Sequence, residues 1–134
     1  MTVEAEWQPA QGNTLATLRA GQADAAKFEF LSDLEPSAGG AGTAPTPHDL
    51  LAASLAACTV LTLQLYSKRK QMPLEGVRVT VDQVQHAGEL QLDRRVYLSG
   101  PLSEQAISDC LRIANLCPIH KALQGKFSIS TELG

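Results

Sequence analysis

The spacing of apolar residues changes along the chain, and each spacing predicts a different element. Near the N-terminus, apolar and polar residues alternate between polar turns and predict three strands: Thr2 to Trp7, Thr14 to Ala20 and Lys27 to Leu31. Two longer alternating runs, 76–85 and 90–99, flank Ala87-Gly88 and predict a β-hairpin. Between the early strands and this hairpin, residues 36–45 are small and rich in glycine. We expect them to form no regular structure of their own.

The strongest element lies between the early strands and the hairpin. From Thr46 to Lys70 the sequence predicts one helix of about 24 residues. Thr46 is a capping residue, Pro47 suits the first helical position, and Asp49 stands where an acid returns the capping hydrogen bond. From Leu50 to Leu65 the helix is apolar nearly all round, a pattern typical of a helix buried on most sides. One short domain hardly wraps such a helix, so we expect a second subunit to help cover it.

The C-terminal third predicts a second helix and a last strand. Ser103 is a capping residue, and an apolar stripe follows at spacings of three and four: Ile107, Cys110, Leu111 and Ala114. Pro118 disfavours helical geometry at the residue before it, so this helix ends near Leu116. A short turn from Pro118 to Leu123 then leads to a strand from Phe127 to Glu132. With no βαβ run, the order of elements predicts an α+β fold with mainly antiparallel sheet.

Length and composition restrict the class of protein. The 134 residues are the size of one domain, and 44% hydrophobic with 19% charged residues exclude a disordered chain. No uninterrupted apolar run reaches the roughly 18 to 20 residues of a membrane span, so we expect no membrane partner. The first residues carry Glu4 and Glu6 and no apolar signal region, which predicts a cytoplasmic protein. A net charge of −3 with scattered basic residues makes nucleic acid an unfavourable partner.

Three cysteines carry the candidate chemistry: Cys58, Cys110 and Cys117. Their odd number and the lack of a CxxC pair argue against a disulfide scaffold or a four-thiolate zinc site. Cys117 precedes Pro-Ile-His-Lys, which predicts a cap position with a lowered thiol pKa, although the residue also continues the apolar stripe. Cys58 lies deep inside the long helix, where it is either a core residue or a thiol activated by side chains from elsewhere. We interpret Cys110 as structural.

A metal site is a weaker interpretation. Cys117 and His120 stand three residues apart, and a zinc site on them requires two more ligands from a distance. Cys58 and His48 are the candidates for those ligands. We therefore expect no metal and no bound cofactor.

Two stretches of the sequence resemble one known family. Residues 39–78, with AACTVLTL around Cys58, and residues 112–123, RIANLCPIHKAL, are similar in order and spacing to the OsmC/Ohr family of thiol-dependent hydroperoxide reductases. The resemblance implies an intertwined homodimer with long central helices buried against each other. It also implies that Cys58 is the peroxidatic cysteine, which reduces an organic hydroperoxide, and that Cys117 resolves its sulfenic acid as a disulfide. The implied reductant is an external dithiol or a lipoylated protein.

The resemblance implies two further site residues and one departure. The family places an arginine from the N-terminal strands near the reactive thiol, and Arg19 is the arginine available there. A glutamate at the start of the central helix holds that arginine in the hydroperoxide-resistance branch, whereas this sequence has His48 followed by Asp49. Neutral imidazole offers one acceptor and cannot clamp a guanidinium as a carboxylate does. Either Asp49 takes over this role at the expense of its capping role, or the arginine is held loosely and activity on hydroperoxides is weak. A third alternative is that this branch acts on another substrate.

One alternative function stays open at this point. A dimeric protein of the same fold that binds a small apolar ligand would use both sulfurs as pocket walls. It would leave hydroperoxides unreduced.

Overall fold

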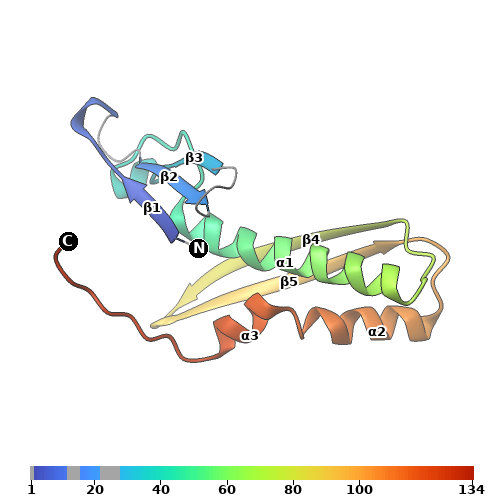
Figure 1. The fold of residues 1–134 in the computed structure, drawn as a ribbon. Coiled ribbons are helices and arrows are strands. Elements are labelled where there is room, and N and C mark those ends of the chain that lie inside the picture. The colour runs from blue at the N-terminus through green and yellow to red at the C-terminus, as the bar shows by residue number, and fades with distance from the viewer. Residues whose placement is uncertain (1, 12–15, 22–27) are drawn as a thin grey trace. The chain divides into compact units, whose positions relative to one another are not determined.

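The computed structural model describes the chain except residues 1, 12–15 and 22–27, and for residues 2, 11 and 18–21 it describes the backbone alone (Figure 1). Its contacts divide the chain into two compact units, Met1–Leu51 and Ala52–Gly134. The long helix α1 (Pro47–Arg69) begins in the first unit and continues through the second.

The first unit holds an antiparallel sheet of three strands in the order β1-β2-β3. The strands are β1 (Thr2–Glu6), β2 (Ala16–Gly21) and β3 (Phe28–Ser32). A short 3-10 turn, Pro9–Gln11, follows β1. The three predicted N-terminal strands are confirmed, and their predicted residues 14, 15 and 27 lie outside the described residues.

The glycine-rich stretch 36–45, predicted to form no regular structure of its own, is ordered by one buried carboxylate that lies outside it. Asp33 accepts hydrogen bonds from the Leu34 and Thr43 backbone N–H groups at 2.7 and 3.1 Å and from the Thr43 hydroxyl at 2.9 Å. A 3-10 turn, Pro36–Ala38, opens the stretch, and Ser32 donates to the Pro45 carbonyl at its end. The sequence prediction missed this because local composition does not reveal a distant anchoring acceptor.

The start of α1 has the predicted capping box. The Thr46 backbone N–H donates to the Asp49 carboxylate at 2.9 Å, and the Asp49 N–H donates to the Thr46 hydroxyl at 3.1 Å. Each side chain thereby satisfies a backbone donor that the first helical turn leaves unpaired. The helix ends at Arg69, and Gln71 follows it with φ +52°.

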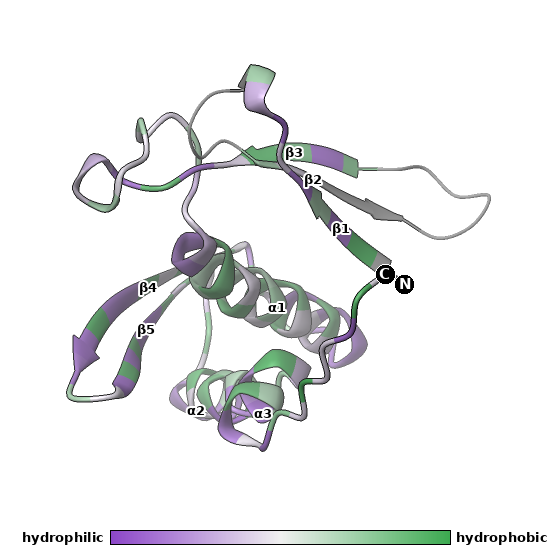
Figure 2. Ribbon diagram, turned by 90° about the vertical axis from the view of Figure 1, so that its left-hand side faces the viewer, coloured by the Kyte–Doolittle hydropathy of each residue, from purple (hydrophilic) through white to green (hydrophobic). Residues whose placement is uncertain are grey.

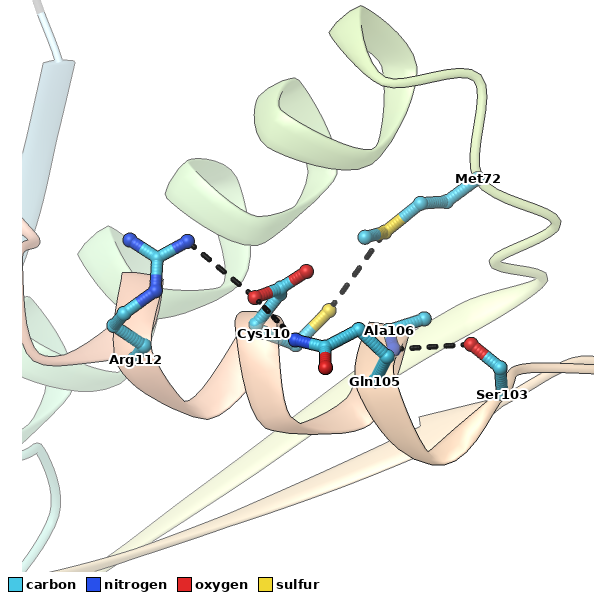
Figure 3. Close-up of polar contacts among 7 residues, drawn as sticks. Met72, Ser103, Gln105, Ala106, Cys110 and Arg112 are labelled. Carbon is cyan, nitrogen blue, oxygen red and sulfur yellow. Dashed lines mark hydrogen bonds and ion pairs between the residues drawn. The ribbon is translucent and has the colours of Figure 1, made fainter.

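The second unit packs a β-hairpin and two shorter helices with α1. The hairpin is confirmed, with β4 (Gly76–His86) and β5 (Glu89–Ser99) joined through Ala87 and Gly88 at φ +29° and +87°. Positive φ at both turn residues matches the turn type that suits twisted antiparallel strands. The helices are α2 (Glu104–Ala114) and α3 (Pro118–Gln124), so the predicted turn at Pro118 is a short helix. Ser103 caps α2 by accepting from the Ala106 N–H, as predicted (Figure 3).

The core of the second unit lies where α1, α2 and the hairpin meet. Its buried residues are Leu63, Cys110 and Ala114, with five partly buried neighbours: Met72, Val77, Val96, Leu98 and Ile113. Figure 2 shows the alternating hydropathy of β4 and β5 that supplies one side of this core. The Cys110 thiol donates to the Met72 sulfur at 4.0 Å (Figure 3). Burial, with a smaller effect of Asp109, raises the pKa of Cys110, which fits a structural thiol.

The prediction that α1 is buried on most sides with the help of a second subunit stays a prediction, because the structure is that of one chain. The helix buries one stripe: Ala52, Leu55, Thr59, Leu63 and Ser67. Leu61 and Leu65, on a second apolar stripe with Ala53 and Ala57, stay 57% and 59% exposed because one hairpin and two short helices cover a single side. By length and composition alone α1 is also long and apolar enough to cross a membrane, a test that the core helices of water-soluble proteins pass as well.

The prediction of a strand from Phe127 to Glu132 is wrong for the single chain. Residues 125–134 form no helix or strand, and Phe127, Ile129 and Leu133 are exposed. A strand needs a partner with a free edge, and alternation in the sequence does not supply one. This segment therefore has strand composition without strand pairing.

Candidate active site around two cysteines

Cys58 occupies a half-buried position in the middle of α1. Its sulfur lies 4.0 Å from the Thr62 hydroxyl, one turn along the helix. The next residue, Thr59, is fully buried and donates its hydroxyl hydrogen to the Leu55 carbonyl at 2.7 Å. The helix thus presents Cys58 and Thr59 together, with Cys58 the more accessible of the two.

Cys117 is the N-cap residue of α3, as the sequence predicts. Its backbone is extended, Pro118 follows in the first turn, and the Cys117 sulfur accepts a hydrogen bond from the His120 N–H at 3.3 Å. The side chain is fully buried, with 0% exposure. The Cys117 sulfur therefore caps α3 by accepting a backbone N–H, as a serine or aspartate oxygen does at other helix starts.

The fold brings these two cysteines together although they are far apart in sequence. The Cys117 sulfur lies 3.9 Å from the hydroxyl of Thr59, the residue after Cys58, and the Cys58 thiol is near enough to lower the pKa of Cys117. Both cysteines carry free thiols in this structure. The pair is therefore placed for exchange between a dithiol and a disulfide without a large rearrangement.

Arg94 of β5 is the cation at this site, and the sequence analysis missed it. Its guanidinium donates to the Thr59 hydroxyl at 3.0 Å, the Ala114 carbonyl at 3.1 Å and the Asn115 side-chain oxygen at 2.8 Å, and it lies 3.2 Å from Nδ1 of His120. The sequence does contain a pattern that sets Arg94 apart. Alternate residues of β5 are partly buried, namely Leu90, Leu92, Arg94, Val96 and Leu98, so one arginine stands in an apolar row.

Several partners act on the ionisation of Cys117. Burial opposes the charged form, but it is outweighed by the hydrogen bond from the His120 N–H, by the interactions with the Cys58 and Thr59 side chains, and by the positive charge of Arg94. The pKa of Cys117 is consequently lower than the ordinary value of 9.0. A thiolate is the nucleophilic and the leaving form of cysteine, so this environment prepares Cys117 for both roles.

The other predicted site residues lie in the first unit. Arg19 is in β2, in register with Glu4 of β1 and Glu29 of β3, and its side chain is outside the described residues. His48 is exposed in the first turn of α1, and the Asp49 carboxylate takes part in the capping box. The assignment of Arg19, His48 and Asp49 to the Cys58 thiol stays a prediction.

The zinc interpretation gains no support from the described residues. Outside the gaps at 1, 12–15 and 22–27, no group of three histidine, cysteine, aspartate or glutamate side chains is arranged to hold a metal ion. His120 directs Nδ1 toward the Arg94 guanidinium, a cationic neighbour that disfavours a metal ion there.

Comparison with protein families identifies the group. The model of the OsmC-like protein family matches residues 39–132, which include both cysteines and Arg94. The chain belongs to the OsmC-like family. Comparison with functionally curated proteins gives no match.

Solved structures agree with this assignment at the level of the fold. A protein of Psychrobacter arcticus described as an osmotic stress-induced and detoxification response protein is 22% identical, with a TM-score of 0.75 over 91% of this chain and 87% of that one. An OsmC-like protein of Mycoplasma pneumoniae is 21% identical, with a TM-score of 0.74 over 92% and 86%. An organic hydroperoxide resistance protein of Legionella pneumophila is 19% identical, with a TM-score of 0.66 over 92% and 88%.

The lowered pKa of Cys117 predicts a pH dependence of stability. Between that pKa and 9.0 the unfolded chain binds more protons than the folded chain, so the free energy of unfolding of the reduced protein rises with pH in this window. Replacing Cys117 by serine removes this contribution, and Cys110→Ala is the control that keeps it. Urea denaturation at several values from about pH 6 to pH 9 measures the slope. Equal slopes for the reduced wild-type protein and Cys117→Ser would contradict the assignment.

Proposed function

We propose that the protein reduces organic hydroperoxides with thiols, using Cys58 as the attacking residue and Cys117 as the resolving residue. The observation that carries the proposal is the contact between these two side chains in the second unit. Membership of the OsmC-like family, with a structural relative named as an organic hydroperoxide resistance protein, supports the choice of substrate. A cytoplasmic location, where dithiol reductants are present, fits the same cycle.

The proposed reaction has three steps. The Cys58 thiolate attacks the terminal oxygen of the hydroperoxide, the O–O bond breaks, and the alkoxide takes a proton and leaves as an alcohol. The Cys117 thiolate then attacks the sulfur of the Cys58 sulfenic acid, the S–O bond breaks, and the hydroxide takes a proton and leaves as water, which gives a disulfide between the two residues. An external dithiol, free or as the lipoyl group of a protein, reduces the disulfide and is oxidised to its own disulfide.

The two environments favour this division of roles. Cys58 is half-buried and lies in a largely apolar helix, so an alkyl chain finds apolar contacts beside its sulfur. Cys117 is fully buried and is held by hydrogen bonds, so a substrate reaches it only after Cys58. An apolar approach favours organic hydroperoxides over hydrogen peroxide.

Arg19 belongs to the proposal as the cation near Cys58, with His48 or Asp49 as its partner. A positive charge near the Cys58 sulfur would favour its thiolate and orient the hydroperoxide oxygens. The family resemblance carries this assignment. The capping role of Asp49 means that the carboxylate would have to serve the helix start and the arginine together.

We also propose a homodimer, because the described part of the chain leaves apolar surface uncovered on α1 and near the C-terminus. On α1 this surface is the second stripe, with Leu61 and Leu65, and near the C-terminus it is the exposed segment with Phe127 and Ile129. A partner copy would cover the stripe with its own helix and offer a strand edge to the segment. Burial of this surface favours association at roughly 25 cal/mol per Å2 of apolar area.

Peroxidase activity tests the function. With an alkyl hydroperoxide and a dithiol, we expect Cys58→Ser to abolish turnover, because the attacking sulfur is gone. We expect Cys117→Ser to lower steady-state turnover by about tenfold or more, because the sulfenic acid lacks its resolving thiol. Cys110→Ser is the control that keeps activity. Hydroperoxide consumption is the readout, and full activity of Cys58→Ser, or no activity of the wild-type protein, would overturn the proposal in favour of a ligand-binding role.

Sedimentation velocity tests the dimer. We expect the sedimentation coefficient of the wild-type protein to correspond to the mass of two chains. We expect the double variant Leu61→Glu, Leu65→Glu to sediment as a monomer, because two carboxylates per helix would be buried unpaired in the interface. Gln64→Glu, which adds a charge beside the stripe, is the control that stays dimeric. A wild-type protein with the mass of a single chain would contradict the proposal.

A further inference from the structure

Arg94 connects the segments that carry the two cysteines. On α1 it holds Thr59, the residue after Cys58. On the other side it holds the Ala114 carbonyl and the Asn115 side chain, which precede Cys117, and His120, which follows it. One half-buried guanidinium therefore fixes the connection between α2 and α3, with the Cys117 sulfur inside it, against the middle of α1.

The contacts also fix the state of the histidine beside Cys117. A guanidinium has donors and no acceptor, so Nδ1 of His120 accepts from Arg94 and the ring proton of the neutral imidazole lies on Nε2. Arginine stays charged at every physiological pH. The groups facing the Cys117 sulfur are then a permanent cation from β5, the His120 N–H from α3, and the Cys58 thiol and Thr59 hydroxyl from α1.

We propose that Arg94 is a positioning residue that makes the disulfide exchange directional: the external thiol attacks the sulfur of Cys58, and Cys117 is the leaving group. The proposal rests on the proposed function, which supplies the Cys58–Cys117 disulfide. It extends that function by assigning a role to a residue outside the thiol pair.

Access and charge point in the same direction. The attacking thiolate must reach one of the two sulfurs, and Cys58 is half-buried whereas Cys117 has no exposed surface. The electron pair of the broken S–S bond goes to the sulfur that leaves. At Cys117 that charge meets the His120 N–H and the field of Arg94, whereas among the side chains that the structure describes Cys58 has the Thr62 hydroxyl at 4.0 Å as a polar neighbour.

The exchange balances without any further reactant. A thiolate of the dithiol forms a bond to the Cys58 sulfur as the Cys58–Cys117 bond breaks, and Cys117 leaves as a thiolate. The second thiolate of the dithiol then attacks the first sulfur of the same dithiol, which is bonded to Cys58 in the mixed disulfide. This step forms the cyclic disulfide of the reductant and returns Cys58 as a thiolate. Two electrons pass from the dithiol to the protein.

Trapping the mixed disulfide tests the direction. The protein is oxidised with diamide, exposed briefly to a limiting amount of the monothiol cysteamine, quenched with acid and peptide-mapped. In the wild-type protein we expect about tenfold more cysteamine on Cys58 than on Cys117. Equal labelling, or labelling mainly on Cys117, overturns the proposal, and this result requires no variant.

Variants of one strand test the role of Arg94. We expect Arg94→Gln to slow the exchange by about tenfold and to bring the labelling ratio toward one, because the leaving sulfur loses its cation. Arg94→Lys keeps the positive charge and loses the paired N–H donors of the guanidinium, so we expect its labelling ratio to fall between those of the wild-type protein and Arg94→Gln. Arg95→Gln, the same change at the next, exposed position of β5, is the control with the wild-type ratio. An unchanged ratio in both Arg94 variants overturns the proposal.

The use of diamide lets the direction of exchange be tested independently of peroxidase activity. Diamide forms the disulfide without a hydroperoxide, so the direction of exchange is measured even if the protein reduces no hydroperoxide. A protein with the Cys58 preference and no peroxidase activity would overturn the proposed function and support the directional exchange. Failure of diamide to link Cys58 with Cys117 would overturn the directional exchange.

Discussion

The hydrogen bonds of the Arg94 guanidinium are the interaction on which the candidate site depends. A half-buried cation costs free energy unless its donors are satisfied, and here the partners come from α1, from the end of α2 and the residue after it, and from α3. The hydrogen bonds of this one guanidinium therefore hold α1, the end of α2 and α3 at fixed separations. The same arrangement places a positive field beside a buried sulfur, which would otherwise be the least reactive kind of thiol.

The second constraint is the apolar surface that the single chain leaves uncovered. α1 carries the reactive sulfur on a helix with two apolar stripes, and the chain itself buries one of them. The exposed stripe and the unpaired C-terminal segment both favour association with a second copy. In the proposed dimer the approach to Cys58 would be lined in part by the partner, so the surface that drives assembly would also shape the entry of an organic substrate.

Sequence reasoning succeeded where the signal was local. The capping box at Thr46 and Asp49, the turn at Ala87-Gly88 and the cap position of Cys117 each depend on residues within a few positions of one another. It failed at residues 127–132, because strand formation there depends on an edge that the sequence does not specify. It also missed Arg94, whose role requires the register of a hairpin and the position of a helix start 20 residues or more away. The choice of Arg19 came from resemblance, and its side chain lies outside the described residues.

The whole proposed cycle requires that Cys58 and Cys117 form one redox pair. Intact-protein mass with peptide mapping tests it most directly, after slightly less than one equivalent of an organic hydroperoxide is added to the fully reduced protein. We expect a loss of about 2 Da, because a disulfide removes two thiol hydrogens, with Cys58 linked to Cys117 and Cys110 unmodified. An unchanged mass, or oxidation confined to Cys110, would contradict it.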